Sequence, residues 1–521
     1  MIFVTEPTNS CLTGHVEGRA IIDRQSRFEE LQKKLIPLWK SIERLSEDEQ
    51  TIVVVPTMGS AARVPQMRGL EERFLFLLFL LRQPRARLVY VTGQPIDPTI
   101  IDYYLSLLPG VIPSQARPRF FNPSPFDGEP IPLTEKILAR PRFLEHLRSL
   151  IPDPDRAHLV PYSTTEDDVE LAVQLGIPMY GADPRHFHLG TKTGCRRLFA
   201  ETGVRHPLGH EDLRSVPDLV GAVVQMRAER PIMARAIVKL NEGSSGSGNA
   251  SLDLAGLPEP GSPDEPKLVE ERIRSMELES EKRTIDEYLD ALADGGIVEE
   301  RIEGGELRSP SVQMRITPLG KLELLSTHDQ LLGGPTGQAY LGAKFPADPD
   351  YAVTITKEAA KVGQRMAEQG VIGRFAVDFI VVRLPDGSWD PFAIELNLRK
   401  GGTTHPFLTL QFLTDGTYDP ETATFTAPSG RTKYFVATDH AESEQYRGLT
   451  HDGLFDLTVR HGLHFDQSRQ TGVVFHMMSA LPEMGRVGFT AVGDSHEEAW
   501  ELYERVHRVL EEEALGAFTP D

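Results

Sequence analysis

The chain has 521 residues, a net charge of −21 and a hydrophobic content of 40%. This length suggests about three or four structural units, and the composition is that of an ordinary globular protein. The acidic excess argues against a nucleic-acid partner, which needs a positive surface. Two cysteines, Cys11 and Cys195, provide neither a disulfide framework nor a Cys-rich zinc site.

The N-terminal residues lack the basic segment and the long apolar segment of a secretory signal. The longest apolar run, Phe74–Leu81, is far shorter than a membrane span. We therefore expect a cytoplasmic protein without a membrane partner. The run itself predicts a core helix, with the interface of a homo-oligomer as the alternative.

Strand and helix patterns alternate through residues 1–184, as is typical of a doubly wound parallel α/β domain. Strands are expected at 51–56, 88–92 and 158–162, and helices at 26–46, 70–82, 98–108 and 165–175.

From about residue 185 the pattern changes to α+β, with helices and hairpins, and a second α+β unit is expected at 406–521. Strands are expected near 231–240, 250–252 and 297–302, hairpins at 311–325 and 375–398, and helices at 192–202 and 351–369. The stretch 253–290 is acidic and begins rich in Pro and Gly, so it is interpreted as an insertion.

The hairpin at 373–399 carries the most specific pattern. Its turn signal, Asp386-Gly387, places Asp378 opposite Glu395, with Asn397 on the same polar face. Facing carboxylates repel each other unless a cation lies between them. Carboxylate and amide oxygens suit Mg²⁺, which commonly bridges nucleotide phosphates. The alternative is a solvated sheet face with diagonal ion pairs.

The same register places Arg399 opposite Arg374 at the other end of this face. Two facing arginines also repel, so we expect an anion there. Arg315, in the preceding hairpin, is a further candidate for that anion site.

A Gly- and Ser-rich loop follows the strand that ends near Lys239. Backbone N–H groups in such a loop can wrap phosphates, and Lys239 could reach the same phosphates. The loop is neither a Walker loop nor a dinucleotide fingerprint. A flexible exposed loop is the alternative for its candidate residues, which are Gly243, Ser244, Ser245 and Gly246.

Lys192 lies at the start of an expected helix. The helix dipole disfavours a cation at that end unless an anion binds there as well, so Lys192 is a candidate phosphate ligand. An exposed lysine is the alternative.

His328 enters a Gly-rich segment that Lys344 closes. We expect the segment 328–344 to be a mobile lid over a substrate, with a simple surface turn as the alternative.

Taken in chain order, these features resemble the ATP-grasp superfamily over about 185–405. The features that match are Lys192, Lys239 with its Gly/Ser loop, the strand around Glu299, then Asp378 and finally Glu395-x-Asn397.

The resemblance implies that ATP lies between two α+β subdomains, with a lid subdomain at about 190–298, behind an N-terminal pre-ATP-grasp domain. It implies that the two lysines hold the ATP phosphates and that Glu299 and Ile302 contact adenine and ribose. It also implies two Mg²⁺ ions, with Mn²⁺ as an alternative, on Asp378, Glu395 and Asn397.

A closer resemblance is to peptide ligases of the pheganomycin type. It rests on Arg73 with the apolar run after it, 91–96, 326–330 and 395–399, and it extends to 471–485. This resemblance implies ATP-dependent amide formation between a small carboxylate donor and an amino-acid or peptide acceptor.

The hypothesis is therefore a carboxylate–amine ligase. A substrate carboxylate would attack the γ-phosphate, and an amine would displace phosphate from the acyl phosphate, with release of ADP. Arg399, with Arg374 or Arg315, would steady the acyl phosphate. The alternatives are an ATP-binding scaffold or sensor without turnover and a small-molecule kinase.

Overall fold

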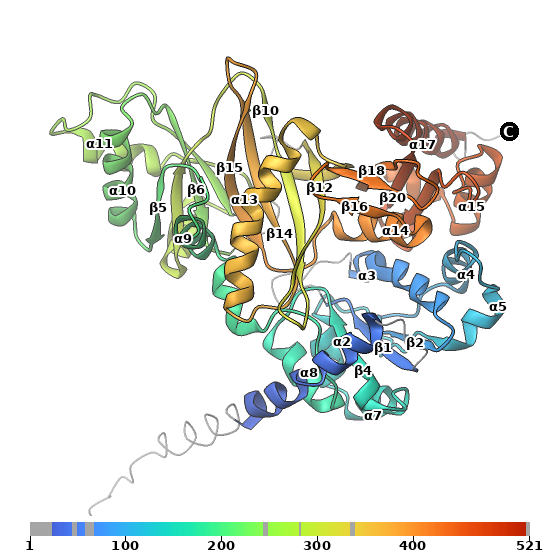
Figure 1. Cartoon of the computed structure of the whole chain (residues 1–521). Helices are drawn as coiled ribbons and strands as arrows, with labels where there is room; N and C mark the ends of the chain where they lie inside the picture. The colour runs from blue at the N-terminus through green and yellow to red at the C-terminus, as the bar shows by residue number, and fades with distance from the viewer. Residues whose placement is uncertain are drawn as a thin grey trace, which may run out of the picture.

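The structure is a computed structural model that describes residues 23–43, 49–57, 67–242, 248–280, 283–333 and 339–516. Its parts are arranged around a large central sheet (Figure 1). The N-terminal domain lies at the bottom of this view, the lid subdomain at the left and the C-terminal elements at the right. The predicted phosphate-binding residues Gly243, Ser244, Ser245 and Gly246 fall outside the described residues.

The N-terminal domain is built on a parallel sheet with strand order β3-β2-β1-β4. Side chains of β1 alternate between two cores, with Ile52 and Val54 in one and Val53 and Val55 in the other. The doubly wound parallel α/β class is confirmed. The strands are β1 (Gln50–Val55), β2 (Ala86–Tyr90), β3 (Phe120–Phe121) and β4 (Ala157–Pro161).

Helices cover both faces of this sheet. Helix α8 (Glu166–Leu175) begins with a capping box between Thr165 and Asp168 and ends at Gly176, whose φ is 71°. The helix expected over 26–46 is interrupted by a turn at 33–34. The other helices are 23–32, α2 (Leu35–Glu43), α3 (Met67–Glu71), α4 (Pro98–Ser106), α5 (Pro113–Ala116), η2 (Arg117–Arg119), α6 (Leu133–Leu138), α7 (Pro141–Ser149) and η3 (Pro154–Arg156).

The apolar run forms a 3₁₀ helix, η1 (Glu72–Arg82), rather than the expected α-helix. Its Phe and Leu side chains are buried on several sides, against β2, α4 and α14. The run is therefore core of this chain, as the first of the two predictions stated.

The lid subdomain has its own antiparallel sheet, with order β5-β9-β6-β7-β8, and its own hydrophobic core. The strands are β5 (Gly209–Leu213), β6 (Arg235–Leu240), β7 (Asn249–Asp253), β8 (Glu277–Leu278) and β9 (Gly296–Glu300). The helices are η4 (Pro184–Gly190), α9 (Lys192–Glu201), α10 (Val216–Glu229), α11 (Glu265–Ile273), α12 (Ile285–Ala291) and η5 (Leu292–Asp294).

The segment 253–290 differs from the expected insertion. Val269 and Ile273 of α11 belong to the lid core, and Glu265 forms a buried ion pair with Arg227 of α10. These apolar residues have the spacing of a helix, but they lie in an acidic stretch. The composition of that stretch therefore indicated an insertion and not a core helix. The segment is thus an integral part of the lid.

The large sheet has nine strands in the order β10-β14-β11-β12-β13-β18-β20-β19, with β15 paired to β14. It continues from β13 into β18, so no break in the sheet separates 185–405 from 406–521. Helix α13 (Pro349–Glu368) packs on β11 and β12. The first strands are β10 (Leu307–Arg308), β11 (Pro310–Ile316), β12 (Leu322–Gly333), β13 (Ala339–Phe345), β14 (Gly373–Arg383) and β15 (Trp389–Asn397).

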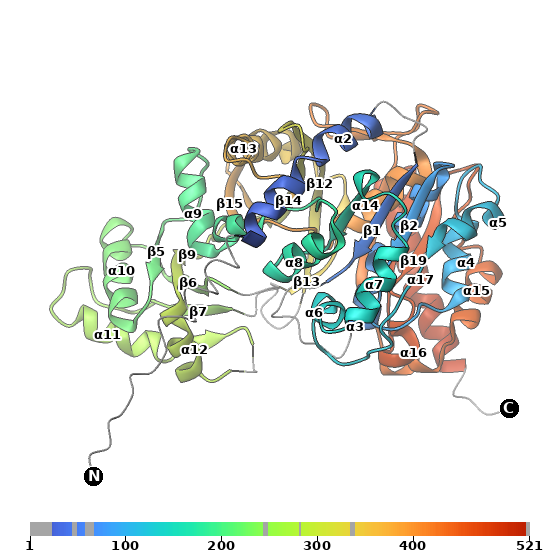
Figure 2. The ribbon, with the colours of Figure 1, turned by 90° about the horizontal axis from the view of Figure 1, so that it is seen from below.

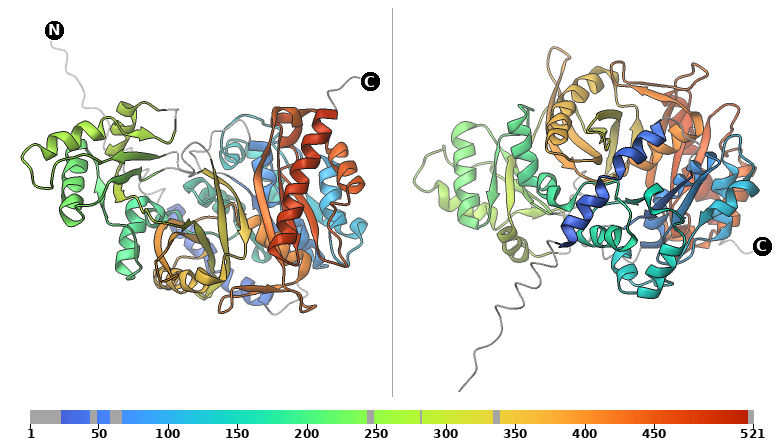
Figure 3. Two further views of the ribbon diagram at one scale, coloured as in Figure 1. Left: turned by 90° about the horizontal axis from the view of Figure 1, so that it is seen from above. Right: turned by 60° about the horizontal axis from the view of Figure 1, so that its bottom comes forward.

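The C-terminal part completes this sheet, and the long helix α17 (His496–Gly516) lies against β18 and β20 (Figure 3). Its strands are β16 (Thr417–Asp419), β17 (Thr424–Thr426), β18 (Tyr434–Glu442), β19 (Gly472–His476) and β20 (Arg486–Gly493). Its remaining helices are α14 (Thr404–Thr414), η6 (Glu444–Gly448), α15 (His451–Arg460) and α16 (Ala480–Met484).

One hydrophobic core runs through the N-terminal domain, the large sheet and the C-terminal elements. Tyr104 of α4 donates a hydrogen bond to the Phe475 carbonyl of β19, at 3.0 Å. The lid sheet with α10, α11 and α12 lies away from the C-terminal part (Figure 2) and has a core of its own, whereas Cys195, Leu198 and Phe199 of α9 belong to the large core. Helix α9 therefore packs on β15 of the large sheet, while the lid sheet has a separate core.

Among the described residues, no helix is both long enough and apolar enough to cross a bilayer.

Candidate active site

The hairpin β14–β15 has the predicted register where the acidic side chains lie. Asp378 pairs with Glu395, and Asn397 pairs with Ala376. A bulge directly after Asp378 shifts the rest, so Phe379 faces Ala393. Bulges re-aim side chains beside functional sites, and this one lies next to the paired carboxylates.

Asp378 is held by its neighbours on both sides. Asn397 Nδ2 donates to Asp378 Oδ2 at 3.0 Å, and Ser311 of β11 is its partner on the other side. Burial and the nearby charge of Glu395 raise the pKa of Asp378 to about 6. Two carboxylates are thus held close together although their charges repel, which is the arrangement that a cation would stabilise.

Glu395 is the carboxylate that faces the lid. Burial alone would raise its pKa, but Lys192 and Arg399 outweigh burial, so its pKa is lowered. Arg399 also lowers the pKa of Asp378, which places its charge beside the acidic pair. The charge of Arg399 therefore acts on both carboxylates of the acidic pair, and its role with the acyl phosphate stays a prediction.

Lys192 is the first residue of α9 and is 8% exposed. Its Nζ lies 2.6 Å from Glu395 Oε1, which joins the lid to the large sheet. Thr191 caps the helix by accepting a hydrogen bond from Gly194 N at 3.0 Å. Lys192 is therefore buried beside Glu395 and is not the exposed lysine of the alternative, and its role as a phosphate ligand stays a prediction.

Lys239, on β6, forms an ion pair with Glu299 of the neighbouring strand β9. Arg196 Nη1 lies 3.4 Å from the other oxygen of Glu299. Sequence analysis missed Arg196, although its spacing of four residues from Lys192 places both on one helix face. Ile302 lies two residues beyond the end of β9 and is partly exposed.

Arg315 and Arg374 lie elsewhere. They face each other on β11 and β14, and β15 ends before Arg399, so the predicted pairing of Arg374 with Arg399 is wrong. Arg315 forms an ion pair with Glu323, with Nε and Oε2 2.5 Å apart, and its guanidinium lies 5.2 Å from the Trp39 ring. Arg374 lies four residues along β14 from Asp378, about 13 Å for an extended strand.

Arg374 is buried, and among the described residues its Nη1 has no hydrogen-bond partner. Burial and the charge of Arg315 lower the pKa of Arg374 to about 10. These two arginines therefore form a basic pair separate from the acidic one, and Arg315 lies against Trp39 of α2.

His328 is fully buried in an aromatic cluster with Phe345 and Phe435, and not in a lid. Its Nε2 lies 2.8 Å from Ser326 Oγ. Lys344 faces Asp329 across β12 and β13, away from the acidic pair. The polar signal of His328 was misleading because β12 runs through the core, where Ser326 and Gln313 contact its Nε2 and, among the described residues, its Nδ1 has no hydrogen-bond partner.

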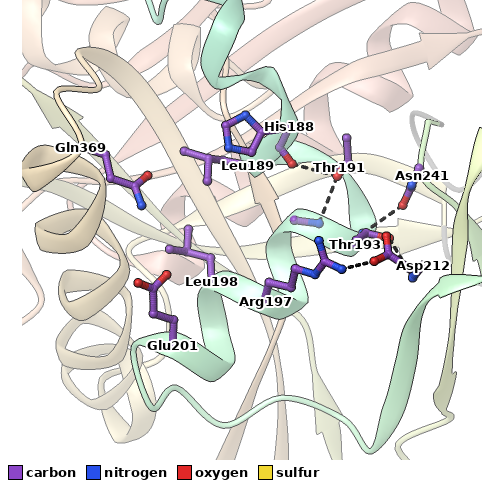
Figure 4. A pocket seen from close by; sticks show the side chains of 11 residues that line it. His188, Leu189, Thr191, Thr193, Arg197, Leu198, Glu201, Asp212, Asn241 and Gln369 are labelled. Carbon is purple, nitrogen blue, oxygen red and sulfur yellow. Dashed lines mark hydrogen bonds and ion pairs between the residues drawn. The ribbon is translucent and has the colours of Figure 1, made fainter.

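A cavity of about 450 Å³ lies beside α9 (Figure 4). It is lined by Thr193, Arg197 and Glu201, and an Arg197–Asp212 ion pair crosses it. Lys192 and Arg196 do not line it. We therefore do not assign the nucleotide to this cavity.

The chain is similar to several known proteins. Residues 185–261 and 265–421 match the IQCH-like ATP-grasp family, and 454–506 match the PGM1 C-terminal domain. The chain is 28% identical over 460 residues to the L-propargylglycine–L-glutamate ligase of Streptantibioticus cattleyicolor, covering 86% of this chain and 90% of that protein.

It is also 22% identical over 500 residues to IQ motif-containing protein H of Danio rerio, covering 86% of this chain and 47% of that longer protein. Among solved structures, the biotin carboxylase domain of the Hydrogenobacter thermophilus 2-oxoglutarate carboxylase, in complex with MgADP, ADP and bicarbonate, matches with a TM-score of 0.51. That match has 13% identity and covers 89% of each chain.

These findings identify residues 185–421 as an ATP-grasp domain, and the chain as a whole is similar to an L-propargylglycine–L-glutamate ligase. Within the superfamily, residues 185–421 are an ATP-grasp domain of the IQCH-like kind. ATP and Mg²⁺ are general for such domains, and the oxygen donors of Asp378, Glu395 and Asn397 fit Mg²⁺.

Proposed function

We propose that the chain forms an amide bond between two small substrates through an acyl phosphate, with release of ADP and phosphate. The observation that carries this proposal is the junction between lid and sheet. There, Lys192 of the lid contacts Glu395, directly opposite Asp378, at 2.6 Å. An Mg-ATP site needs cations that bind the phosphates and carboxylates that bind the metal ions. The two sides of this junction supply these groups.

The lid supplies the positive charge. Lys192 and Lys239 are both nearly buried, and each is held by a carboxylate, Glu395 or Glu299. Phosphate oxygens would compete with these carboxylates for the ammonium groups. We propose that the two lysines bind the ATP phosphates, where charge develops in phosphoryl transfer.

The sheet supplies the oxygen ligands. Two carboxylates and one amide, from Asp378, Glu395 and Asn397, exceed what one Mg²⁺ needs beside phosphate, because Mg²⁺ retains several waters. We therefore propose two ions, with Mn²⁺ as a substitute. When bound, the ions neutralise the phosphate oxygens.

Arg399 is the remaining cation at the acidic pair, because its charge acts on both Asp378 and Glu395. We propose that it binds the transferred phosphoryl group and the carboxylate that receives it. Acyl phosphates hydrolyse in water, so the site has to close during turnover. The lid, with its own core, is the element that would close it.

For the substrates, the Streptantibioticus relative is named as a ligase of L-propargylglycine and L-glutamate. We propose that this chain likewise takes amino acids or short peptides, one as the carboxylate donor and one as the amine acceptor. L-Glutamate with small apolar amino acids is the first combination to test.

The test is product analysis with purified protein, Mg-ATP and pooled amino acids and dipeptides. ADP and phosphate that depend on both an acid and an amine would support the proposal. AMP and pyrophosphate would reject the acyl-phosphate route. Asp378→Asn serves as the matched inactive control.

Hydroxylamine distinguishes this proposal from a small-molecule kinase, because only an acyl phosphate gives a hydroxamate. ATP binding without ADP formation over a broad substrate set would instead favour the scaffold or sensor.

A further inference from the structure

A second cluster of chemically active side chains lies in the C-terminal part of the large sheet. His405 of α14, Asp439 of β18 and His476 of β19 converge there, and each is 4% exposed or less. The two Nε2 atoms lie 2.9 and 2.7 Å from the same oxygen, Asp439 Oδ1. They lie 3.0 Å from each other.

Hydrogen bonds cannot satisfy all three contacts. Asp439 is ionised, because Arg73 Nη2 lies 2.8 Å from its other oxygen, so it only accepts. If both Nε2 atoms carry a proton, the two N–H groups of His405 and His476 meet at 3.0 Å. If either nitrogen lacks the proton, its lone pair faces the carboxylate. Every protonation state therefore leaves one repulsive contact in a buried place.

A metal ion removes this conflict, because it accepts both nitrogen lone pairs and the carboxylate oxygen together. The surroundings also hold the ligands in place. A Cβ on Gly488 of β20 would lie 2.1 Å from His476 Nε2, so only glycine lets the ring lie there. Arg73 orients the carboxylate through the oxygen that the histidines do not use.

We propose that His405, Asp439 and His476 bind one transition-metal ion, with Zn²⁺ as the best match. Two imidazoles and a carboxylate are ligands of Zn²⁺, and three protein ligands leave a position for water. Mg²⁺ prefers oxygen ligands, so this site is distinct in chemistry from Asp378 and Glu395.

The three ligands come from separate elements, and Arg73 comes from η1 of the N-terminal domain. An ion here would therefore tie the C-terminal strands to α14 and, through Arg73, to the N-terminal domain. Because it binds the folded state, it should raise the melting temperature.

The test uses the full chain, produced with added Zn²⁺ and desalted, with metal content measured by mass spectrometry. We expect about one zinc ion per chain. Zn²⁺ titration against a chromophoric chelator should show at least about tenfold weaker binding in His476→Ala and in Asp439→Asn.

Two control variants distinguish this site from other metal-binding groups. Asp378→Asn removes an oxygen ligand at the proposed Mg²⁺ site, and His188→Ala removes an exposed histidine. Both should keep wild-type zinc affinity. Wild-type protein without zinc after reconstitution, or wild-type zinc affinity in both cluster variants, would overturn the proposal.

If the cluster variants do not fold, X-ray absorption spectroscopy of the zinc-loaded wild type tests the proposed site instead. Two imidazoles in the coordination shell support the site, and a shell of oxygen alone overturns it.

Discussion

Lys192 Nζ and Glu395 Oε1, 2.6 Å apart, join the first turn of α9 in the lid to strand β15 in the large sheet. This ion pair adds to an apolar junction, because Cys195, Leu198 and Phe199 of α9 lie in the large core, where α9 packs on β15. Both partners have proposed roles with Mg-ATP. Nucleotide binding would thus break the ion pair between Lys192 and Glu395. Lys192 would then bind a phosphate of ATP, and Glu395 would bind a metal cation.

The first prediction concerns Glu395→Gln. The amide keeps the size of the side chain but removes the charge that a cation needs. We expect ADP formation to fall at least about a hundredfold, because electrostatic stabilisation supplies most of the rate enhancement in phosphoryl transfer. Steady-state ADP release measures this, and circular dichroism checks the fold.

Asp390→Asn is the matched control, since Asp390 lies on the same strand and pairs with Arg205. It should keep turnover within about twofold, as expected for an exposed ion pair. Near-normal ADP release from Glu395→Gln would show that turnover does not need the charge of Glu395.

The second prediction concerns Arg196→Met. Glu299 is shared between Lys239 and Arg196, so removal of Arg196 leaves Lys239 bound more tightly by that carboxylate. Lys239 then has less charge to offer phosphate. We expect KM for ATP to rise about tenfold, which corresponds to about 1.4 kcal/mol, with a smaller effect on kcat.

Arg197→Met is the control for that change, because Arg197 is the next residue of α9 and pairs with Asp212 at the surface. Its KM for ATP should stay within about twofold. Equal effects of the two substitutions would mean that Arg196 acts only through helix stability.

The β14–β15 hairpin was predictable from its turn signal, although the turn is one residue longer than predicted, because Leu384 N donates to the Ser388 carbonyl and Arg383 faces Trp389. Asp386-Gly387 identified the turn, and the pairing of Asp378 with Glu395 is confirmed. The bulge after Asp378 was not predictable, because no residue type marks it. The bulge shifts the register by one residue between the turn and Asp378, and this shift offsets the one-residue error in the turn, so Asp378 faces Glu395 as predicted.

Other parts depend on tertiary contacts that local patterns do not contain. Arg374 pairs with Arg315, because β11, and not β15, runs beside it at that point. The polar appearance of His328 gave no sign that β12 passes through an aromatic cluster. The His405–Asp439 contact joins residues that lie 34 positions apart.

The third prediction uses His328 as a buried core residue. Burial lowers its pKa from 6.5 to about 3. Between those values the unfolded chain binds a proton that the folded chain does not, so this residue destabilises the fold as pH falls below 6.5. At pH 5 the penalty is about 2 kcal/mol.

His328→Gln removes that penalty. Its free energy of unfolding, relative to wild type, should therefore rise by about 2 kcal/mol between pH 7.5 and pH 5, as measured by urea denaturation. Its kcat at pH 7.5 should stay within a few-fold of wild type. A large loss of kcat with unchanged stability would instead mean that His328 has a catalytic role.

The last prediction concerns the ion pair between Arg227 and Glu265, which is buried inside the lid. Glu265 also accepts a hydrogen bond from Gly261 N at 2.7 Å, and Arg227 donates one to the Pro258 carbonyl at 2.7 Å. Glu265→Ala leaves a buried guanidinium without its carboxylate, which costs about 3–5 kcal/mol.

Because the lid has its own core, we expect this loss to appear as faster amide hydrogen exchange in β6 and β9, with little change in the N-terminal sheet. Glu270→Ala, which removes an exposed pair with Arg274, should change stability by less than about 0.5 kcal/mol. If Glu265→Ala leaves exchange in β6 and β9 unchanged, then 253–290 is a separable insertion after all, as its composition first indicated.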